Sequence, residues 1–325
     1  MHMKVQENLI KSIGGYMPLE IPQGRSYYPE LKAVNTGRNA LEYIIRVRKY
    51  SAIYLPYFTC DVLLEPLQKL GIKIHYYSVD GNLDPIIDFE IDARSCFLYT
   101  NYFGIKTETV KWLSSFAKNL IIDNAQAFFS SPMKGIDTFY SCRKFFGVPD
   151  GAYVYTSNDI GLSLKTDHSV SRFAHLIKSI DYDIEEGYAD YLANNELLSN
   201  TEIKKMSVLT QQLLAGVDYA QCANIRVNNF NYLHDHLEKV NNLPINLSHN
   251  DVPMVYPLLM EDPTLKEKLI KNKIFVATYW PNVFDWAQKD SYEYFLSENL
   301  IALPIDHRYS FQDMRFMLSI LNSLL

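Results

Sequence analysis

Residues 53–77 read IYLPYFTCDVLLEPLQKLGIKIHYY, and this stretch decides the fold. Ile53–Tyr57 is rich in β-branched and aromatic residues and predicts a strand. Asp61–Leu70 has apolar residues at helical spacing and predicts a helix that ends at Gly71. Ile72–Tyr77 predicts a second strand. Two strands joined by a crossover helix lie parallel in one sheet, so the stretch predicts an α/β fold.

The same alternation continues on both sides of this stretch, from residue 35 to about residue 160. The further expected strands are Cys96–Thr100, Leu120–Asp123, Thr138–Ser141 and Ala152–Thr156, and the further expected helices are Ala40–Arg46 and Glu108–Lys118. Crossover helices cover both faces of such a sheet, so we expect a mostly parallel sheet that binds ligands at the carboxyl ends of its strands.

The second half of the chain has a different pattern. Residues 169–198 are irregular and bear tyrosines, and a long helical pattern follows from Ser207 to about Val240. Beyond it lies the stretch Pro253–Leu259 (PMVYPLL), and we expect a helix at Leu265–Lys271, a strand at Ile274–Thr278 and a terminal helix at Phe311–Leu325. A core seldom grows past about 250–300 residues. We therefore expect two domains: residues 1–205, and residues 206–325 with a linking helix and a small α/β domain.

Charge and hydropathy exclude several classes of protein. The net charge is -6 and the basic residues are scattered, which argues against nucleic-acid binding. No apolar run approaches the roughly 18–20 residues that cross a bilayer. The first residues, MHMKVQENLIKSIGG, lack the apolar core of a secretory leader, so we expect a cytoplasmic protein in which the sequon Asn246-Leu247-Ser248 is a chance match.

Cysteine and histidine spacing gives no sign of a metal site. Cys60, Cys96, Cys142 and Cys222 are too far apart for a paired motif, and we expect reduced thiols. The two close histidines are two residues apart on an expected helix, where side chains diverge.

The aromatic content of the sequence is unusually high. With 24 Tyr, 17 Phe and 3 Trp, part of it is expected to line a ligand cleft.

Residues 35–41, NTGRNAL, place a polar turn with a glycine directly before a helix. Free N–H groups and the positive end of the helix dipole make such a place an anion site, most simply for phosphate. Taken alone, Thr36 or Asn35 as a plain helix cap is the simpler interpretation.

Residues 120–126, LIIDNAQ, end an apolar run in Asp123. A carboxylate at the carboxyl end of a strand could hold a protonated ring nitrogen or a metal. An aspartate that only makes the turn is the alternative.

Residues 141–152, SCRKFFGVPDGA, place Lys144 three residues after a strand, with Ser141 at an SxxK position and two phenylalanines beside it. A lysine in a partly desolvated apolar pocket has a lowered pKa and can form a Schiff base. In isolation, a solvated surface lysine is the alternative.

Together the segments resemble those of the fold-type-I pyridoxal-phosphate enzymes, and among them the DegT/DnrJ/StrS-type sugar aminotransferases. The resemblance covers most of the chain. It rests on TGRNAL at 36–41 (the family has SGTxAL), the strand–helix–strand at 55–80, IIDNAQA at 121–127 (EDxAQA), CRKFFGVPDGAYVYT at 142–156 (TKxxxxGEGGxxxT) and ALPIDHRYSFQDM at 302–314 (LPxHxxLxxxD). It implies a large domain with a mostly parallel seven-stranded sheet, a small C-terminal α/β domain and a homodimer.

The resemblance also implies roles for individual residues. Lys144 would be the catalytic lysine that binds the aldehyde of pyridoxal 5'-phosphate and moves protons, and Asp123 would pair with the ring nitrogen. Gln126 would lie near the 3-oxygen. The phosphate would be held by the backbone of Gly37 and Arg38 and by the hydroxyl of Ser141.

The sequence departs from the family at several of these positions. Cys60 stands where the family has an aromatic ring stacked on the cofactor, so either that ring is lost or Tyr57, Phe58 or Tyr102 replaces it. Phe139 stands five residues before Lys144, where the family has a serine that binds phosphate. Asp150 replaces a glutamate, and the partner-subunit asparagine is missing, with Arg226, Asn228 and Asn229 nearby.

The resemblance implies an aminotransferase that acts on a nucleotide-linked keto-sugar, with glutamate as amino donor, in polysaccharide synthesis. Arg308 could hold the donor's carboxylate with two hydrogen bonds. The expected cleft residues are Tyr182, Tyr188, Tyr279, Trp280, His307 and Arg308. The alternatives are an amino-acid substrate, a non-catalytic or regulatory protein, and dehydration of a deoxysugar, against which Lys144 argues because that branch has histidine there.

Overall fold

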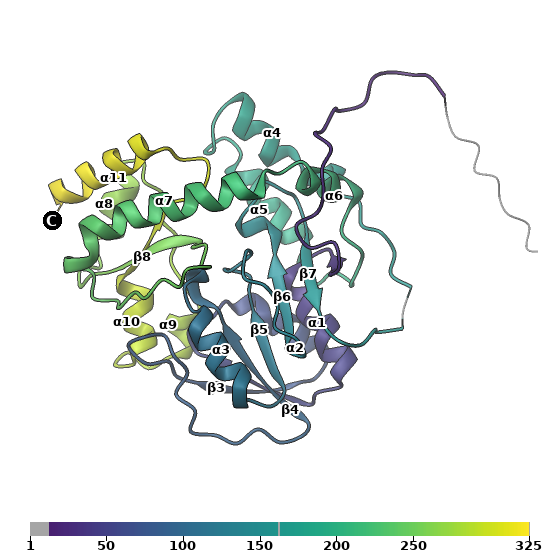
Figure 1. Cartoon of the computed structure of the whole chain (residues 1–325), viewed down its shortest axis with the longest axis horizontal. Coiled ribbons are helices and arrows are strands. Elements are labelled where there is room, and N and C mark those ends of the chain that lie inside the picture. The colour runs from purple at the N-terminus through teal and green to yellow at the C-terminus, as the bar shows by residue number, and fades with distance from the viewer. Residues whose placement is uncertain (1–12, 162, 325) are drawn as a thin grey trace, which may run out of the picture.

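The computed structural model describes residues 13–161 and 163–324. Figure 1 shows the whole chain, with the large sheet in the first half of the sequence and a smaller sheet in the second. Residues 1–12, on which most of the expectation about a secretory leader rests, and Leu325, the expected last residue of the C-terminal helix, lie outside the described residues. None of the helices in the described ranges is both long enough and apolar enough to cross a membrane.

The first half forms one seven-stranded sheet in the order β1-β7-β6-β5-β4-β2-β3. Neighbours from β3 to β6 are parallel, and β7 is antiparallel to both β6 and β1. The strands are β1 Lys32–Val34, β2 Ala52–Pro56, β3 Lys73–Tyr77, β4 Ser95–Thr100, β5 Leu120–Asp123, β6 Asp137–Ser141 and β7 Ala152–Tyr155. The predicted α/β class and the mostly parallel seven-stranded sheet are confirmed.

Both faces of this sheet are covered, as the burial of β4 shows. All six residues of β4 are buried. Cys96 and Leu98 pack in the cluster that contains α1 (Gly37–Arg48) and α2 (Leu64–Lys69), whereas Phe97 and Tyr99 pack in the cluster that contains α3 (Thr107–Phe116). Successive side chains of a strand point to opposite faces, so a strand buried on both sides lacks the alternation of apolar and polar residues, as the middle of β4 shows.

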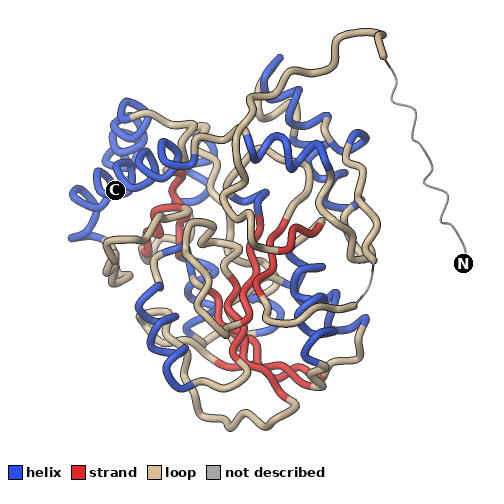
Figure 2. Tube along the Cα trace, turned by 45° about the vertical axis from the view of Figure 1, so that its right-hand side comes forward, coloured by secondary structure: helices blue, strands red, loops and turns tan. Residues whose placement is uncertain are grey.

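The second half carries a two-stranded antiparallel sheet of β8 and β9. Five helices surround it or lead into it. Their bounds, with those of the two strands, are α7 Tyr219–Leu237, β8 Val255–Leu259, α8 Leu265–Lys271, α9 Val283–Trp286, α10 Tyr292–Asn299, β9 Leu300–Pro304 and α11 Phe311–Leu324. Figure 2 shows the strands in the interior with helices around them. The domain boundary near residue 205 stays a prediction.

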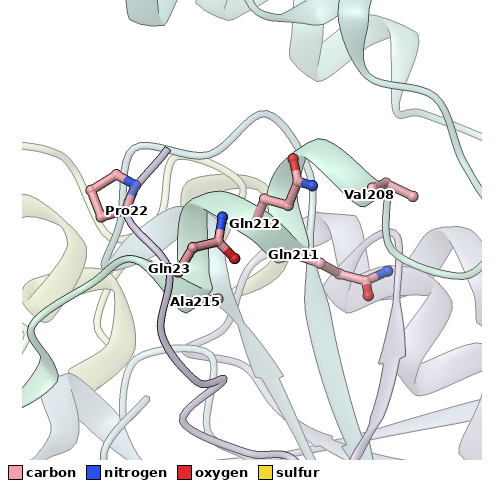
Figure 3. A pocket seen from close by; sticks show the side chains of 6 residues that line it. All are labelled: Pro22, Gln23, Val208, Gln211, Gln212 and Ala215. Carbon is pink, nitrogen blue, oxygen red and sulfur yellow. The ribbon is translucent and has the colours of Figure 1, made fainter. Parts of the chain in front are cut away.

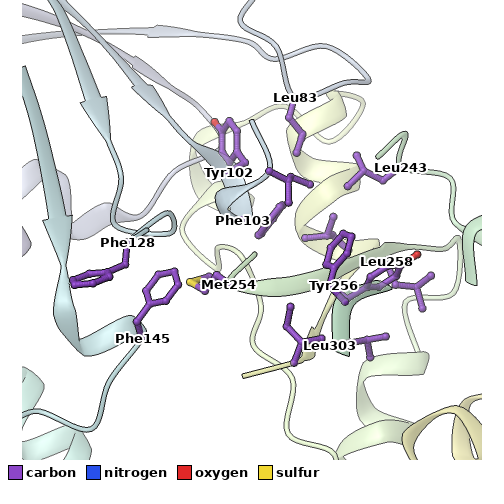
Figure 4. Close-up of a cluster of buried hydrophobic side chains, with 14 of the residues drawn as sticks. Leu83, Tyr102, Phe103, Phe128, Phe145, Leu243, Met254, Tyr256, Leu258 and Leu303 are labelled. Carbon is purple, nitrogen blue, oxygen red and sulfur yellow. The ribbon is translucent and has the colours of Figure 1, made fainter. Parts of the chain in front are cut away.

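One apolar cluster joins the two sheets. It includes Phe128 and Phe145 beside the large sheet and Met254, Tyr256 and Leu303 from the small one (Figure 4). Tyr256 and Leu303 are fully buried. The turn that follows β6 is therefore packed against the second half of the chain.

Two predictions about the middle of the chain are wrong. The stretch predicted as irregular, Ser169–Leu198, contains the helices α4 (Ala174–Asp181) and α5 (Tyr188–Leu197). The single helix predicted from Ser207 to Val240 is two helices, α6 (Val208–Ala215) and α7. The break follows from the residues between them, because Gly216 packs against the backbone oxygen of Pro22 and the side chain of Asp218 caps α7.

The predicted strand Ile274–Thr278 does not form. Its residues alternate between buried Ile274 and Val276 and exposed Phe275 and Ala277, as in a strand, but no ladder in the described residues includes them. The partner of β8 is β9 instead, an apolar stretch at which no strand was expected.

Candidate active site

Several side chains meet at the carboxyl edge of the large sheet. Asp123 ends β5, and its neighbours in the ladder are Thr100 at the end of β4 and Phe139 in β6. Ser141 ends β6, and the short 3-10 turn Cys142–Lys144 follows it directly. Parallel strands present their carboxyl ends at one edge, so Asp123 and Lys144 are brought together although 21 positions separate them in the sequence.

Asp123 is a buried carboxylate with no ion-pair partner in the described part of the chain. It is 6% exposed, and Oδ1 accepts a hydrogen bond from the Ala125 backbone N–H at 2.8 Å. Burial raises the pKa of Asp123, while the charge of Lys144 and the Ala125 hydrogen bond lower it again in part. A buried carboxylate that still needs a cation fits the protonated ring nitrogen of pyridoxal phosphate.

Lys144 extends from a well-fixed turn. Phe145 N–H donates to Cys142 O at 3.0 Å, and Cys142 N–H donates to Gly151 O at 3.0 Å. Lys144 itself is exposed, and its charge lowers the pKa values of both Asp123 and Cys60 against the effect of their burial. The backbone is held while the amine reaches toward the buried groups, as a lysine that binds an aldehyde requires.

The N-terminus of α1 lies beside the end of β6. Thr36 caps the helix by accepting from Asn39 N–H at 3.1 Å, and the N–H groups of Gly37 and Arg38 are in the first turn, where no helical carbonyl can accept from them. A Cβ added to Gly37 would lie 3.9 Å from the Cβ of Ser141. This juxtaposition fits a phosphate held by two backbone N–H groups and a hydroxyl.

The side chain of Arg38 is already engaged. Its Nη1 lies 2.7 Å from Glu65 Oε2, and both side chains are 14% exposed. Glu65 also accepts from Asn200 N–H at 2.7 Å. Arg38 is thus placed to serve an anion through its backbone rather than through its guanidinium group.

Gln126 has a buried amide group that would accommodate a polar group of a ligand. It is 1% exposed, and its Oε1 accepts from Phe103 N–H at 2.8 Å, which fixes the orientation of the amide. Its Nε2 is buried and makes no hydrogen bond. An unsatisfied buried donor costs roughly 1–3 kcal/mol, and an acceptor such as the cofactor's 3-oxygen would remove that cost.

None of the three rings expected to replace the stacking aromatic stands free at this site. Phe58 and Tyr102 are fully buried, with ring centroids 5.6 Å apart, and the Tyr102 hydroxyl donates to Phe58 O. Tyr57 stacks on Tyr76 at 5.0 Å. Tyr279 is another aromatic residue close to Cys60. Its pKa is raised by burial, by Tyr191 and by Cys60.

The residues expected to contact substrate have different environments. Tyr182 and Tyr188 are 74% and 60% exposed on α4 and α5. Trp280 is 6% exposed and packs edge-on against Phe58, and the His307 ring lies 6.0 Å from Phe146. Arg308 makes two hydrogen bonds to Asp306, at 2.7 and 2.8 Å. An incoming carboxylate would have to displace Asp306 to use Arg308 as expected.

Arg226 and Asn229, which lie near the place of the missing asparagine, are committed to carbonyl groups. Arg226 is 1% exposed and donates to Met254 O at 2.9 Å, to Phe145 O at 3.3 Å and to Pro253 O at 3.5 Å. Burial lowers the pKa of Arg226 to about 10. Because Phe145 follows Lys144, this arginine ties the lysine's turn to β8. The sequence shows the arginine but not these long-range partners.

Two cavities lie elsewhere. One, of about 170 Å³, is lined by Pro22, Gln23, Val208, Gln211, Gln212 and Ala215 (Figure 3). The other, of about 360 Å³, lies beside β1 and includes Lys32, Tyr43 and Asp159 in its lining. Neither has a predicted site residue in its lining. In the described residues, no three His, Cys, Asp or Glu side chains gather as metal ligands would.

No family model matches the sequence, and no curated protein does. Solved structures do match it over most of its length. A DegT DnrJ EryC1 StrS aminotransferase from Brucella abortus is 16% identical, with 90% of this chain and 85% of that chain covered and a TM-score of 0.61. DesV from S. venezuelae is 14% identical, with 90% and 84% covered and a TM-score of 0.63. GDP-4-keto-6-deoxy-D-mannose-3-dehydratase from E. coli, with bound hydrated PLP, is 14% identical, with 90% and 87% covered and a TM-score of 0.62.

These similarities extend across both sheets. At this level of identity they establish architecture, while substrates belong to the individual proteins. The chain therefore has the fold of the DegT/DnrJ/EryC1/StrS-type sugar aminotransferases, fold type I of the pyridoxal-phosphate-dependent enzymes.

Proposed function

We propose that this protein is a pyridoxal-phosphate-dependent aminotransferase of the DegT/DnrJ/StrS family that acts on a nucleotide-linked keto-sugar, with glutamate as amino donor, in polysaccharide synthesis. The observation that carries the proposal is that Asp123, which is buried and has no ion pair in the described residues, ends β5 at the same carboxyl edge of the sheet as the turn that carries Lys144. The fold supports the same class. So do two of the similar structures, one of which is named as an aminotransferase and the other of which has bound PLP.

The cofactor, when bound, supplies an electron-accepting ring that stabilises negative charge at the carbon from which a proton is removed. The residues of the chain would hold it and move the proton. Asp123 keeps the ring nitrogen protonated, because a buried carboxylate stabilises a cation beside it. Gln126 Nε2 donates to the 3-oxygen, and the first turn of α1 with Ser141 holds the phosphate.

Lys144 would have two tasks in this arrangement. Its amine would hold the cofactor's aldehyde in the resting enzyme, and when free it would move a proton at the substrate's α-carbon. Backbone hydrogen bonds fix the turn from Cys142 to Phe145 that carries this amine. The phenylalanines at 145 and 146, which are buried, exclude water from that side.

A single-turnover experiment tests the proposal. Protein loaded with pyridoxal phosphate and mixed with glutamate should release about one equivalent of 2-oxoglutarate per site and lose the absorption of the lysine-bound cofactor, because transamination proceeds in two halves. Alanine and glutamine would be offered in parallel to test the donor. Release of no oxo acid from any donor, with the cofactor firmly bound, would exclude transamination.

We also propose that the protein forms a homodimer in the cytoplasm. Four apolar side chains of the α4–α5 region are strongly exposed, namely Ile180, Tyr182, Ile184 and Tyr188, which fits a face that a second copy covers. The four cysteines are free, as expected of a reducing compartment. Sedimentation equilibrium tests the assembly, and a monomer at micromolar concentration would contradict it.

A non-catalytic role is the second candidate. The observation that favours it is Phe139, which fills the place of the family's phosphate-binding serine with a ring that is 1% exposed. In that case the fold would serve regulation or assembly in the same pathway. The affinity for pyridoxal phosphate discriminates the two candidates, because a regulatory protein would dimerise without binding it.

A further inference from the structure

Arg143, the residue directly before Lys144, has a guanidinium group that no carboxylate pairs with in the described residues. Its Nη2 donates to the amide oxygen of Asn195 at 2.7 Å, and the group lies 5.6 Å from the ring centroid of Tyr191. Its Nε is buried and has no hydrogen-bond partner. An arginine has five N–H donors, so this one retains donors for an anion.

Two other arginines, Arg38 and Arg172, influence Arg143. Burial lowers the pKa of Arg143, and so do the charges of Arg38 and Arg172. These two arginines have carboxylate partners of their own, Glu65 and Asp167 at 2.7 Å each. Among these three arginines, Arg143 is the one without an ion pair in the part of the chain that the structure describes.

The one carboxylate that favours the charged form of Arg143 is occupied by other groups. Asp150 is fully buried and accepts from Ser207 N–H at 2.9 Å, from the Ser207 hydroxyl at 2.8 Å and from the Thr210 hydroxyl. These bonds hold Asp150 at the N-terminus of α6. None of these bonds comes from Arg143, so in the described residues the N–H donors of its guanidinium group that Asn195 does not accept are left for a ligand.

The position of Arg143 follows from the end of β6. Phe139 and Ser141 are two residues apart, so their side chains point to the same face of this strand. Phe139 is buried in the cluster that contains α1. Ser141 is the next residue on that face, beside Gly37. Arg143 lies in the turn two residues after Ser141. The hydroxyl group of Ser141 and the guanidinium group of Arg143 therefore follow the buried ring of Phe139 along the chain.

We propose that Arg143 is a phosphate ligand of this site and supplies, through its guanidinium group, the binding that Phe139 cannot. The inference rests on the proposed function and deepens it. A guanidinium group binds phosphate through charge-assisted, often paired hydrogen bonds that exceed those of a hydroxyl. Asn195 and Tyr191, both on α5, hold the group in place from its other side.

The test compares two ligands that differ only by the phosphate. Wild type, Arg143→Gln and Arg143→Lys, all free of cofactor, are titrated with pyridoxal phosphate and with pyridoxal, and binding is followed by the absorption of the lysine-bound ligand. Arg143→Gln should weaken pyridoxal phosphate binding roughly ten- to hundredfold and leave pyridoxal binding within about twofold. The affinity of Arg143→Lys for pyridoxal phosphate should lie between those of wild type and Arg143→Gln, since lysine keeps the positive charge but not the paired N–H donors of the guanidinium group.

Arg172→Gln is the matched control, because it removes a neighbouring charge that already has a carboxylate partner. It should change the affinity for pyridoxal phosphate by less than about threefold. Melting temperatures establish that each variant is folded. If Arg143→Gln does not fold, the affinities of Arg143→Lys and wild type for the two ligands are compared instead.

Three results would overturn the inference. Equal affinity of Arg143→Gln and wild type for pyridoxal phosphate would remove Arg143 from the phosphate site while leaving the proposed function intact. Parallel loss of both ligands would mean that Arg143 supports the turn rather than the phosphate. Absence of binding in wild type would overturn the proposed function and the inference together.

Discussion

Lys144 and Asp123 attract one another across the end of the large sheet, one from the turn after β6 and the other from the end of β5. Burial raises the pKa of Asp123, and the charge of Lys144 is the largest influence that lowers it. The two groups are thus electrostatically coupled before any ligand arrives. The first two predictions concern this pair.

Lys144→Ala should abolish both the absorption of the bound cofactor and the adduct that borohydride traps. The fold should survive with a change of less than about 0.5 kcal/mol in the free energy of unfolding, because the side chain is exposed. Absorbance, peptide mass spectrometry and urea denaturation measure these effects. Lys134→Ala, at another exposed lysine, is the control, and a trapped adduct on any residue other than Lys144 would contradict the assignment.

The raised pKa of Asp123 predicts how the stability of cofactor-free protein depends on pH. The unfolded carboxyl titrates near its ordinary pKa of about 3.9, whereas the buried one keeps its proton to higher pH. The folded state then binds more protons in that window, so the stability from the neutral carboxyl is complete below the unfolded pKa and is lost as pH rises through the folded pKa. Asp123→Asn removes the titrating group.

Urea denaturation of cofactor-free wild type and Asp123→Asn at several values between about pH 4 and about pH 8 measures this effect. The variant should gain stability relative to wild type as pH rises. Two curves that stay parallel over the range would show that Asp123 titrates alike in the folded and unfolded chains. With cofactor present the order should reverse, since the ring nitrogen then loses its counter-charge.

Gly104→Ala should cost about 3 kcal/mol of unfolding free energy. Gly104 has a φ of +73°, and a Cβ there would lie 2.9 Å from the backbone oxygens of Gln126 and Val252. Gly135→Ala is the matched control, because Gly135 has a φ of +83° but open space around it. It should cost about 1 kcal/mol, the conformational part alone. Thermal and urea unfolding measure both, and equal costs would refute the steric part.

Arg226→Met should lower the unfolding free energy by about 2–4 kcal/mol, because it leaves three buried carbonyls without their donor. The absorption maximum of the bound cofactor should shift as well, since Phe145 next to Lys144 loses its tether. Arg46→Met removes a 38% exposed arginine and should change stability by less than about 1 kcal/mol. A loss below about 1 kcal/mol for Arg226→Met would show that burial of the charge offsets its bonds.

The large sheet could be predicted because each of its strands carries a local signal. The strand predicted at Leu120–Asp123 has the same bounds in the structure, and β2 begins one residue before the predicted Ile53. Asp123 and Lys144 could be singled out for the same reason, as each follows a recognisable strand. Their roles at a cofactor remain predictions, but their approach to one another follows from the parallel sheet.

The remaining elements depend on information far away in the sequence. Helix α5 exposes Tyr188 and Tyr191, which blurs the contrast between apolar and polar faces on which a helix prediction relies. A strand needs a partner, and the sequence near Ile274–Thr278 does not show that β8 pairs with Leu300–Pro304 instead. Arg143 stood in the quoted motif, but its freedom from carboxylates is a property of the folded chain.

The turn before α1 is closed by segments that the chain supplies much later. Asn35 N–H donates to Lys204 O at 3.0 Å, and Asn35 O accepts from Gly151 N–H at 2.6 Å. A chain emerging from the ribosome therefore cannot complete this turn until residue 204 has left the exit tunnel, well after the strands themselves are free to pair. Cofactor capture would be a late event of biosynthesis, and the half-made protein would have to remain intact without it.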